Sequence, residues 1–301
     1  MLSPMSNDDR AGIPIPARLH AIRRYDGGAA WLEALPRILR ECVERWALTL
    51  GEPFGDGNVS LTAPVVCADG SDAVLKVQFP GREAEHEADA LALWDGDGAV
   101  RLLAHDRERS ALLLERCVPG TPLSRIDADT ALDVLIGLLP RLWKPVGAPF
   151  MSLADEAAWW ASYLPQQYED AGRPFGRSLL DAALEAIRQL APTQGEQVLL
   201  HQDLHADNVL SAQREPWLVI DPKPLAGERE FAVAPIVRSF ELGHSREQVM
   251  RRLDRLCDEL SLDRRRAGLW TVVQTIAWSM GSEYHARHSE TAGWVLSAVG
   301  W

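Results

Sequence analysis

Polar side chains that could perform chemistry follow two short apolar runs in the second half of this 301-residue sequence. The run Val198–Leu200 is followed by five of them: His201, Asp203, His205, Asp207 and Asn208. A second run, Trp217–Ile220, leads directly into Asp221. Both runs predict buried strands. Because burying carboxylates and amides without partners costs free energy, strands that end in such groups indicate a nearby metal ion or a reacting proton.

The spacing of these residues favours phosphotransfer. A phosphoryl donor brings several negative charges, which Mg²⁺ neutralises through oxygen ligands such as Asn208 and Asp221. A separate carboxylate, Asp203, would then accept or orient the proton of an attacking hydroxyl. Protein kinases place an Asn five residues after the catalytic-loop Asp and bind Mg²⁺ with a later Asp, and Asp203 and Asn208 are also five residues apart. We therefore predict Asp203 as the catalytic residue and Asn208 and Asp221 as metal ligands.

A metallohydrolase is the alternative interpretation of the same residues. His201, Asp203 and His205, at alternate positions, could bind zinc or manganese together with Asp207 and Asp221. That interpretation leaves the position of Asn208 unexplained, and it does not account for the lysine-bearing strand in the first half of the chain. The kinase interpretation explains both.

Lys76 is the informative residue of the first half. It lies inside the apolar run 73–79, so its side chain either extends to solvent at a sheet edge or enters a cleft, where it would bind donor phosphates. The next segment, Arg82–Trp94, has a helical pattern. A kinase lysine pairs with a glutamate on this helix, and we favour Glu87, although the sequence does not exclude Glu83.

Two further segments could contact a nucleotide. Gly51–Cys67 predicts a strand, a glycine turn and a second strand, and Gly55 and Gly57 would let backbone amides approach phosphate oxygens. By itself this is a common hairpin turn. A later strand runs into Glu115–Val118, which has the position of a linker whose backbone would bind an adenine edge, and Glu115 is the residue we predict there.

The loop from His201 to His205, followed by Asn208, resembles the aminoglycoside phosphotransferase family, in which it typically runs His-Gly-Asp-Leu-His with Asn three residues further on. The run Ile220–Pro224, with Gly227 and Glu228, is similar to the streptomycin 6-kinase and hydroxyurea phosphotransferase branch. Two positions depart from the pattern. Gln202 replaces the usual Gly, and Ala232 stands where many relatives carry Asp. Neither is a predicted metal ligand.

The resemblance implies an α+β, protein-kinase-like fold of two lobes. Residues 1–117 would form a small N-terminal lobe built on an antiparallel sheet that binds nucleotide phosphates. Residues 118–301 would form a mostly helical C-terminal lobe with the catalytic loop, the metal ligands and the acceptor site.

The implied activity is phosphorylation of a hydroxyl by ATP with Mg²⁺, and streptomycin is the acceptor we expect. Its guanidinium groups would pair with carboxylates, of which Glu283 is one candidate. The alternatives are a kinase for hydroxyurea, a choline-like amine or a sugar, and a regulatory pseudokinase that only binds nucleotide.

Composition limits the partners and the compartment. The net charge of −12 argues against a nucleic-acid partner and suits a cationic acceptor. Four scattered cysteines predict a reducing cytoplasm. The first residues carry no signal-peptide pattern, and the longest apolar stretch, 131–143, is too interrupted to span a bilayer, so we expect no membrane partner.

The predicted polar lead-in covers residues 1–16. Helical patterns are expected in seven further segments: Ala29–Leu50 with a break at Pro36, Thr130–Trp143, Asp155–Tyr168, Ser178–Leu190, Ala234–Leu242, Arg246–Leu260 and Arg264–His288.

Overall fold

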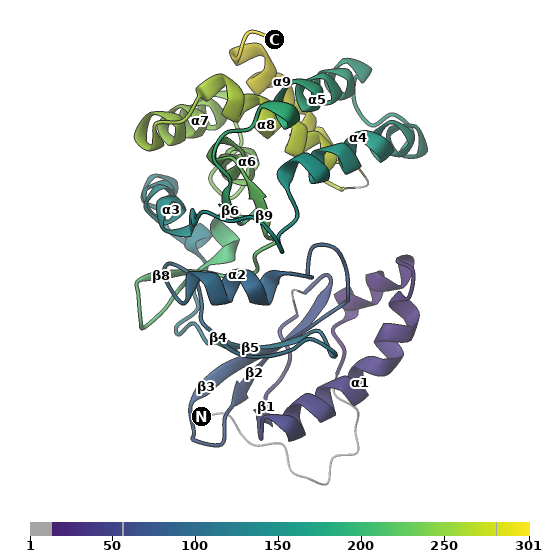
Figure 1. The fold of residues 1–301 in the computed structure, drawn as a ribbon, viewed down its shortest axis with the longest axis vertical. Coiled ribbons are helices and arrows are strands. Elements are labelled where there is room, and N and C mark those ends of the chain that lie inside the picture. The colour runs from purple at the N-terminus through teal and green to yellow at the C-terminus, as the bar shows by residue number, and fades with distance from the viewer. Residues whose placement is uncertain (1–13, 56, 281) are drawn as a thin grey trace. The chain divides into compact units, whose positions relative to one another are not determined.

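The computed structural model of the chain describes residues 14–55, 57–280 and 282–301 and contains two compact units. We call residues 1–96 and 100–120 the sheet unit, and residues 97–99 and 121–301 the helical unit. Each is described by itself (Figure 1). The predicted lead-in, residues 1–16, falls almost entirely outside the described residues.

The sheet unit is built on five antiparallel strands in the order β1-β2-β3-β5-β4. They are β1 (Thr49–Leu50), β2 (Ser60–Val66), β3 (Asp72–Gln78), β4 (Leu102–Asp106) and β5 (Ala111–Glu115). Side chains alternate between the two faces of β3. Leu75 and Val77 join the apolar core, while Lys76 and Gln78 point to the opposite face. The predicted strand at Gly51 is wrong, because β1 ends at Leu50, and residues 51–55 and 57–59 lie outside any strand or helix.

Helix α1 (Gly28–Arg45) covers the apolar face of this sheet. It follows a short 3₁₀ helix, η1 (Ala17–Arg24). The predicted break at Pro36 does not occur. Pro36 cannot donate to the carbonyl one turn earlier, which costs about 3 kcal/mol, but Leu32, Leu35 and Leu39 on either side are buried in the core and offset that cost.

Helix α2 (Glu87–Trp94) is shorter than the predicted helix, because residues 82–86 form turns. The helix begins where burial begins. Glu83 and Glu85 are exposed, whereas Glu87, Ala90 and Leu91 are buried. A segment without a buried face gains too little to maintain a regular helix.

The helical unit contains seven α-helices among its described residues: α3 (Ala128–Leu142), α4 (Leu153–Asp170), α5 (Arg177–Leu190), α6 (Ala234–Arg238), α7 (Arg246–Leu260), α8 (Arg264–Ala277) and α9 (His285–Ala298). Four of them begin with a side chain that caps a backbone N–H two or three residues into the helix: Asp127, Ser152, Ser245 and Asp263. Short 3₁₀ segments complete the unit: η2 (Leu123–Arg125), η3 (Ala191–Thr193), η4 (Ala206–Asn208) and η5 (Arg229–Val233).

Two predicted helices end earlier than their patterns suggested. Helix α6 stops at Arg238 because Arg252 of α7 binds the carbonyls of four residues, Val237, Ser239, Leu242 and Gly243, at 2.9–3.0 Å. Those carbonyls are satisfied outside a helix. The predicted helix 264–288 is two helices, with α8 ending at Ala277 and α9 beginning at His285.

Two small antiparallel sheets position the chemistry-bearing segments of the helical unit. β6 (Val198–Leu200) pairs with β9 (Leu225–Gly227), and β7 (Val209–Ser211) pairs with β8 (Trp217–Val219). The segments after β6 and β8 therefore start from buried, hydrogen-bonded strands. Among the described residues, no helix is both long and apolar enough to cross a membrane.

Candidate active site

Asp203 is the centre of a buried charge cluster in the helical unit. The residue is only 9% exposed. Lys223 Nζ donates to Oδ2 of Asp203, and Arg238 Nη2 lies 3.3 Å from Oδ1. Burial alone would favour the protonated carboxyl, but the charges of Lys223, His205 and Arg238 outweigh it and hold the pKa of Asp203 below its usual range. Asp203 is therefore a carboxylate with a cation on each oxygen.

His201 holds the backbone of the Asp203 loop. Its Nδ1 accepts from the Asp203 N–H at 3.3 Å, so Nε2 carries the proton and donates to the Ile220 carbonyl at 2.9 Å. Burial lowers the pKa of His201 to about 4, which keeps the ring neutral near pH 7. With both nitrogens bonded to the backbone, His201 cannot ligate zinc as the metallohydrolase interpretation requires.

Asn208 and Asp221 are brought to the same loop. The Asn208 side chain donates from Nδ2 to the Asp203 carbonyl at 2.9 Å, and the Ile220 N–H donates to the Asn208 carbonyl at 3.0 Å. Because its nitrogen is used in this way, Oδ1 is the atom of Asn208 that can ligate a metal. Asp221 has a positive φ of 57° and a half-exposed side chain, and its Oδ2 lies 3.9 Å from Lys223 Nζ.

Gln202 also has a positive φ, 63°. This conformation costs a non-glycine residue about 1–2 kcal/mol, which gives a physical reason for a glycine at this position in the motif. Gln274 Nε2 donates to the Gln202 carbonyl at 2.7 Å and ties this turn to α8.

His205, Asp207 and Glu241 form a second group of polar side chains near the Asp203 loop. His205 Nδ1 lies 2.7 Å from Glu241 Oε1, and the nearest donor atoms of His205, Asp207 and Glu241 lie within 4.8 Å of one another. Burial opposes protonation of His205, but its bond to Glu241 and the charge of Asp203 outweigh burial and raise its pKa. Ser124 donates to Asp207 and Ser239 donates to Glu241, so all three already have protein partners.

Trp278 lies beneath both cations of the cluster. The Arg238 guanidinium is 4.6 Å from the centre of the Trp278 ring, and Lys223 Nζ is 5.5 Å from it. Arg238 is the last residue of α6, immediately before the segment that Arg252 holds by its carbonyls. A planar guanidinium stacked on an aromatic ring has little freedom, so the position of Arg238 is fixed from two sides.

In the sheet unit, Lys76 and Glu87 form a buried ion pair. Lys76 Nζ lies 2.8 and 2.7 Å from the two oxygens of Glu87, and the residues are 5% and 1% exposed. Gln78 Nε2 donates to the same carboxylate at 2.5 Å. Glu83 and Glu85 are exposed, whereas Glu87 is buried and contacts Lys76.

The other predicted site residues are less constrained. A Cβ on Gly57 would lie 2.2 Å from the Ser60 carbonyl, so a larger residue does not fit there, whereas nothing lies within 4 Å of a Cβ on Gly55. Glu115 ends β5, and its N–H donates to the Arg101 carbonyl at 2.9 Å, so an adenine edge would have to use other backbone groups of that segment. Glu283 is exposed, and its role stays a prediction.

Comparison with known proteins decides the family. Residues 45–282 match the family described as aminoglycoside/hydroxyurea antibiotic resistance kinase. The chain is 38% identical to a streptomycin 6-kinase of Streptomyces griseus over 280 residues, which are 90% of this chain and 91% of that protein. It is 41% identical to a hydroxyurea phosphotransferase of Kitasatospora aureofaciens over 285 residues, 90% of this chain and 81% of that protein. The chain belongs to this kinase family.

The fold agrees with that assignment. The crystal structure of aminoglycoside phosphotransferase APH(4)-Ia in complex with ADP and hygromycin B has a TM-score of 0.58 at 15% identity, over 86% of this chain and 97% of that one. The predicted α+β, protein-kinase-like fold is thus confirmed, and the chain is an enzyme of the aminoglycoside phosphotransferase type.

Four residues in or around the Asp203 cluster were not singled out from the sequence: Lys223, Arg238, Glu241 and Arg252. Lys223 had a signal, since a lysine between two prolines directly after a predicted metal ligand is unusual. The others are charged residues in or after helical patterns, where exposure is the ordinary expectation. Their partners are 9–36 residues away in the sequence, and no periodicity indicates such pairs.

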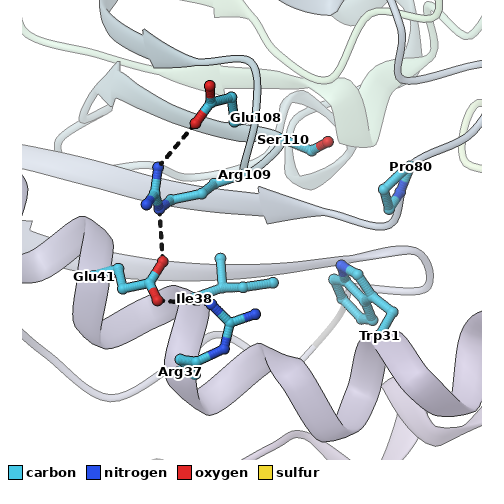
Figure 2. A pocket seen from close by; sticks show the side chains of 8 residues that line it. All are labelled: Trp31, Arg37, Ile38, Glu41, Pro80, Glu108, Arg109 and Ser110. Atoms are coloured by element: carbon cyan, nitrogen blue, oxygen red, sulfur yellow. Dashed lines mark hydrogen bonds and ion pairs between the residues drawn. The ribbon is translucent and has the colours of Figure 1, made fainter.

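The sheet unit also contains a cavity of about 240 Å³, and its lining includes none of the predicted site residues (Figure 2). Trp31, Ile38 and Pro80 form its apolar part. Figure 2 shows Arg109 extending between Glu41 and Glu108, and its Nε lies 2.8 Å from Glu41 Oε2. Because its charged groups neutralise one another, this cavity offers no net charge to a phosphate or a cationic antibiotic.

Proposed function

We propose that this chain is an ATP- and Mg²⁺-dependent O-phosphotransferase that modifies a hydroxyl of streptomycin. The observation that carries the chemistry is the position of Lys223, whose ammonium group contacts Asp203 and lies 3.9 Å from Asp221. The predicted acceptor carboxylate and the predicted metal ligand thus belong to one cluster. Phosphotransfer needs these two groups close together, because the phosphoryl group moves from a metal-bound donor to a hydroxyl that Asp203 orients.

The oxygen atoms in the cluster suit a hard divalent cation. Asn208 Oδ1 and the half-exposed carboxylate of Asp221 are oxygen ligands of the kind that Mg²⁺ prefers. This proposed pair of ligands contains neither a thiolate nor an imidazole, the groups that softer metals favour. We propose that these two residues hold Mg²⁺, which when bound neutralises charge on the donor phosphates.

The sheet unit is proposed to bind the donor nucleotide. Lys76, fixed by Glu87, would pair with the phosphates, and the backbone around Gly55 and Gly57 would approach their oxygens. The linker that begins at Glu115 would receive the adenine. Under this proposal, residues 1–117 serve the nucleotide and residues 118–301 serve the metal and the acceptor. The enzyme would act in the cytoplasm, where ATP is available.

Two observations support streptomycin as the acceptor. Two of the relatives that cover nine-tenths of the chain are streptomycin 6-kinases, and the net charge of −12 attracts a molecule that carries two guanidinium groups. Carboxylates such as Glu283 would pair with those groups in a bidentate manner.

Hydroxyurea is the second candidate, and the charge around Asp203 favours it. Lys223 and Arg238 place two positive charges beside the carboxylate that must meet the hydroxyl, which opposes a guanidinium next to that hydroxyl. Hydroxyurea carries no positive charge next to its hydroxyl, so this repulsion is absent. Its N-hydroxyl is also more acidic than an alcohol, because the carbonyl delocalises the charge of the anion, so a weakly basic Asp203 suffices.

Initial rates of ATP-dependent phosphorylation decide between the two acceptors. Streptomycin, kanamycin, hydroxyurea and choline are compared at low and high salt, with the phosphorylated product identified by mass spectrometry. The proposal expects streptomycin to be the best acceptor and its KM to rise with salt, because charge attraction is screened. A preference for hydroxyurea with no salt effect would replace streptomycin by the second candidate. No ATP consumption with any acceptor would remove this proposal.

A further inference from the structure

Lysine is rare in this chain. Only three of its 31 basic side chains are lysines, at positions 76, 144 and 223, and all the others are arginines. Lys76 is proposed to bind the donor phosphates, and Lys223 lies beside the carboxylates proposed to act on the acceptor and to hold the metal. An ammonium group is a compact point charge on a flexible stem, whereas a guanidinium is a rigid planar fork. A lysine beside Asp203 therefore offers something that the abundant arginines do not.

The backbone at Lys223 is held in place, while its side chain is long enough to move. Pro222 and Pro224 restrict the backbone on both sides, and the Lys223 N–H donates to the His201 carbonyl at 3.0 Å. From this fixed point the side chain reaches Asp203, with Asp221 3.9 Å away, and it is 16% exposed. Its ammonium group thus lies between the two carboxylates that define the proposed path of the phosphoryl group.

Asp203 has positively charged neighbours besides Lys223. Arg238 contacts the other carboxylate oxygen, and His205 Nε2 lies 3.9 Å from that same oxygen. Arg238 is stacked on Trp278 and its segment is held by Arg252, so it stays in place. Lys223 can therefore leave Oδ2 without leaving a buried, uncompensated carboxylate, and the same movement frees Oδ2 to receive the acceptor hydroxyl.

We propose that Lys223 is a further catalytic residue of this kinase, whose ammonium group passes from Asp203 to the γ-phosphoryl group of the donor when the nucleotide binds. This rests on the proposed function. The acceptor oxygen forms a bond to the γ-phosphorus as the bond from that phosphorus to the β–γ bridging oxygen breaks. ADP leaves, the hydroxyl proton passes to Asp203 and then to solvent, and Lys223 neutralises charge on the transferred oxygens.

The test compares the binding of two nucleotides that differ at the γ-position. Calorimetric titration with Mg²⁺ measures the Kd of ADP and of the non-hydrolysable analogue AMP-PNP for the wild-type protein and for Lys223→Met. We expect the variant to bind AMP-PNP about tenfold more weakly, because one charge-assisted hydrogen bond to the γ-phosphoryl group is lost. The affinity for ADP, which has no γ-phosphoryl group, should stay within about twofold of the wild type. The kcat of the variant should fall about 10²-fold or more, and Lys223→Arg should restore part of the AMP-PNP affinity.

Two control variants separate this role from a structural one. Lys144→Met removes the third lysine, which lies in the same unit and pairs with Asp97 at 2.7 Å, and should change neither Kd. Arg238→Met should lower acceptor-dependent kcat/KM and leave the ratio of the two Kd values unchanged. Equal weakening of both nucleotides in Lys223→Met, or no change in either, would overturn the inference while the proposed function stands. If the wild-type protein binds neither nucleotide, the proposed function and this inference are both removed.

Discussion

The two proposed parts of the active site are built in different ways. In the sheet unit, Lys76 and Glu87 form a buried ion pair, 11 residues apart in the sequence and nearly inaccessible to solvent. In the helical unit, Asp203 meets Lys223 and Arg238, which are 20 and 35 residues away. The first joins a strand to the next helix. The second joins several segments, and it keeps its charge balance when one cation moves.

This difference predicts which substitutions lower stability and which lower the rate of turnover. A buried ion pair is costly to break, because removal of one partner leaves the charge of the other buried. A cluster in which each oxygen has its own cation tolerates the loss of one contact. We therefore expect substitutions in the sheet unit to affect folding first, and substitutions in the Asp203 cluster to affect turnover first.

The largest effect is expected for Asp221→Ala. Loss of a metal ligand should lower Mg²⁺-dependent turnover by about 10³-fold or more, since the metal contributes several kcal/mol to the transition state. Asp221 is half-exposed, so the unfolding midpoint should stay near that of the wild type. Turnover as a function of Mg²⁺ concentration, measured together with urea unfolding, checks both statements. Full activity in this variant would remove Asp221 from the metal site.

Lys76→Met should destabilise the sheet unit by about 3–5 kcal/mol, because the buried carboxylate of Glu87 loses the ammonium group that contacts both of its oxygens. The double variant Lys76→Met/Glu87→Leu should regain most of that stability without regaining activity. Arg37→Met is the matched control, since its pair with Glu41 lies at the surface, where solvent screens the charges, and its loss should change stability little. Equal stability losses in the single and double variants would show that the charge left on Glu87 does not cause the destabilisation.

Sequence reasoning worked where partners lie in neighbouring elements. Lys76 and Glu87 belong to a strand and the helix that follows it, and the kinase pattern together with the spacing of Glu87 from the apolar face of that helix indicated the pair. Asp203, Asn208 and Asp221 were indicated by spacing, and their roles as catalytic and metal-binding residues stay predictions. Lys223 and Arg238 reach Asp203 only through the tertiary fold, and their own surroundings in the sequence do not name a partner.

Helix ends show the same limit. The pattern 234–242 is helical, yet α6 ends at Arg238 because Arg252 binds carbonyls of the following segment. Pro36 predicted a break that burial of the flanking leucines overcame. In both cases a contact far away in the sequence outweighs the local preference.

Acid should destabilise the helical unit through His201. Its pKa is about 4 in the folded chain against about 6.5 when unfolded, so the unfolded chain binds the extra proton between these values. The stability is present above about pH 6.5 and lost as pH falls towards 4, by about 3 kcal/mol in total. Urea unfolding from pH 7 to pH 4 should show a shallower loss for His201→Asn. Identical slopes in the two proteins would refute this assignment.

The smallest effect is expected at Gln202. Gln202→Gly relieves a left-handed backbone but gives the unfolded chain more freedom, so the free energy of unfolding should change by less than about 1 kcal/mol. Gln202→Val, a branched residue at the same φ, should lower it by about 2 kcal/mol. Thermal unfolding of both variants measures the difference. Equal stability of the two would mean that the turn adapts and the strain is absent.

The central claim is that Asp203 acts on the acceptor hydroxyl and not on the nucleotide. Asp203→Asn keeps the shape of the side chain and removes its charge. We predict that the variant binds ADP and AMP-PNP with Mg²⁺ at affinities within about threefold of the wild type, while kcat for the best acceptor falls by about 10²–10⁴-fold. A collapse of nucleotide binding in Asp203→Asn, or turnover at the wild-type rate, would contradict the account.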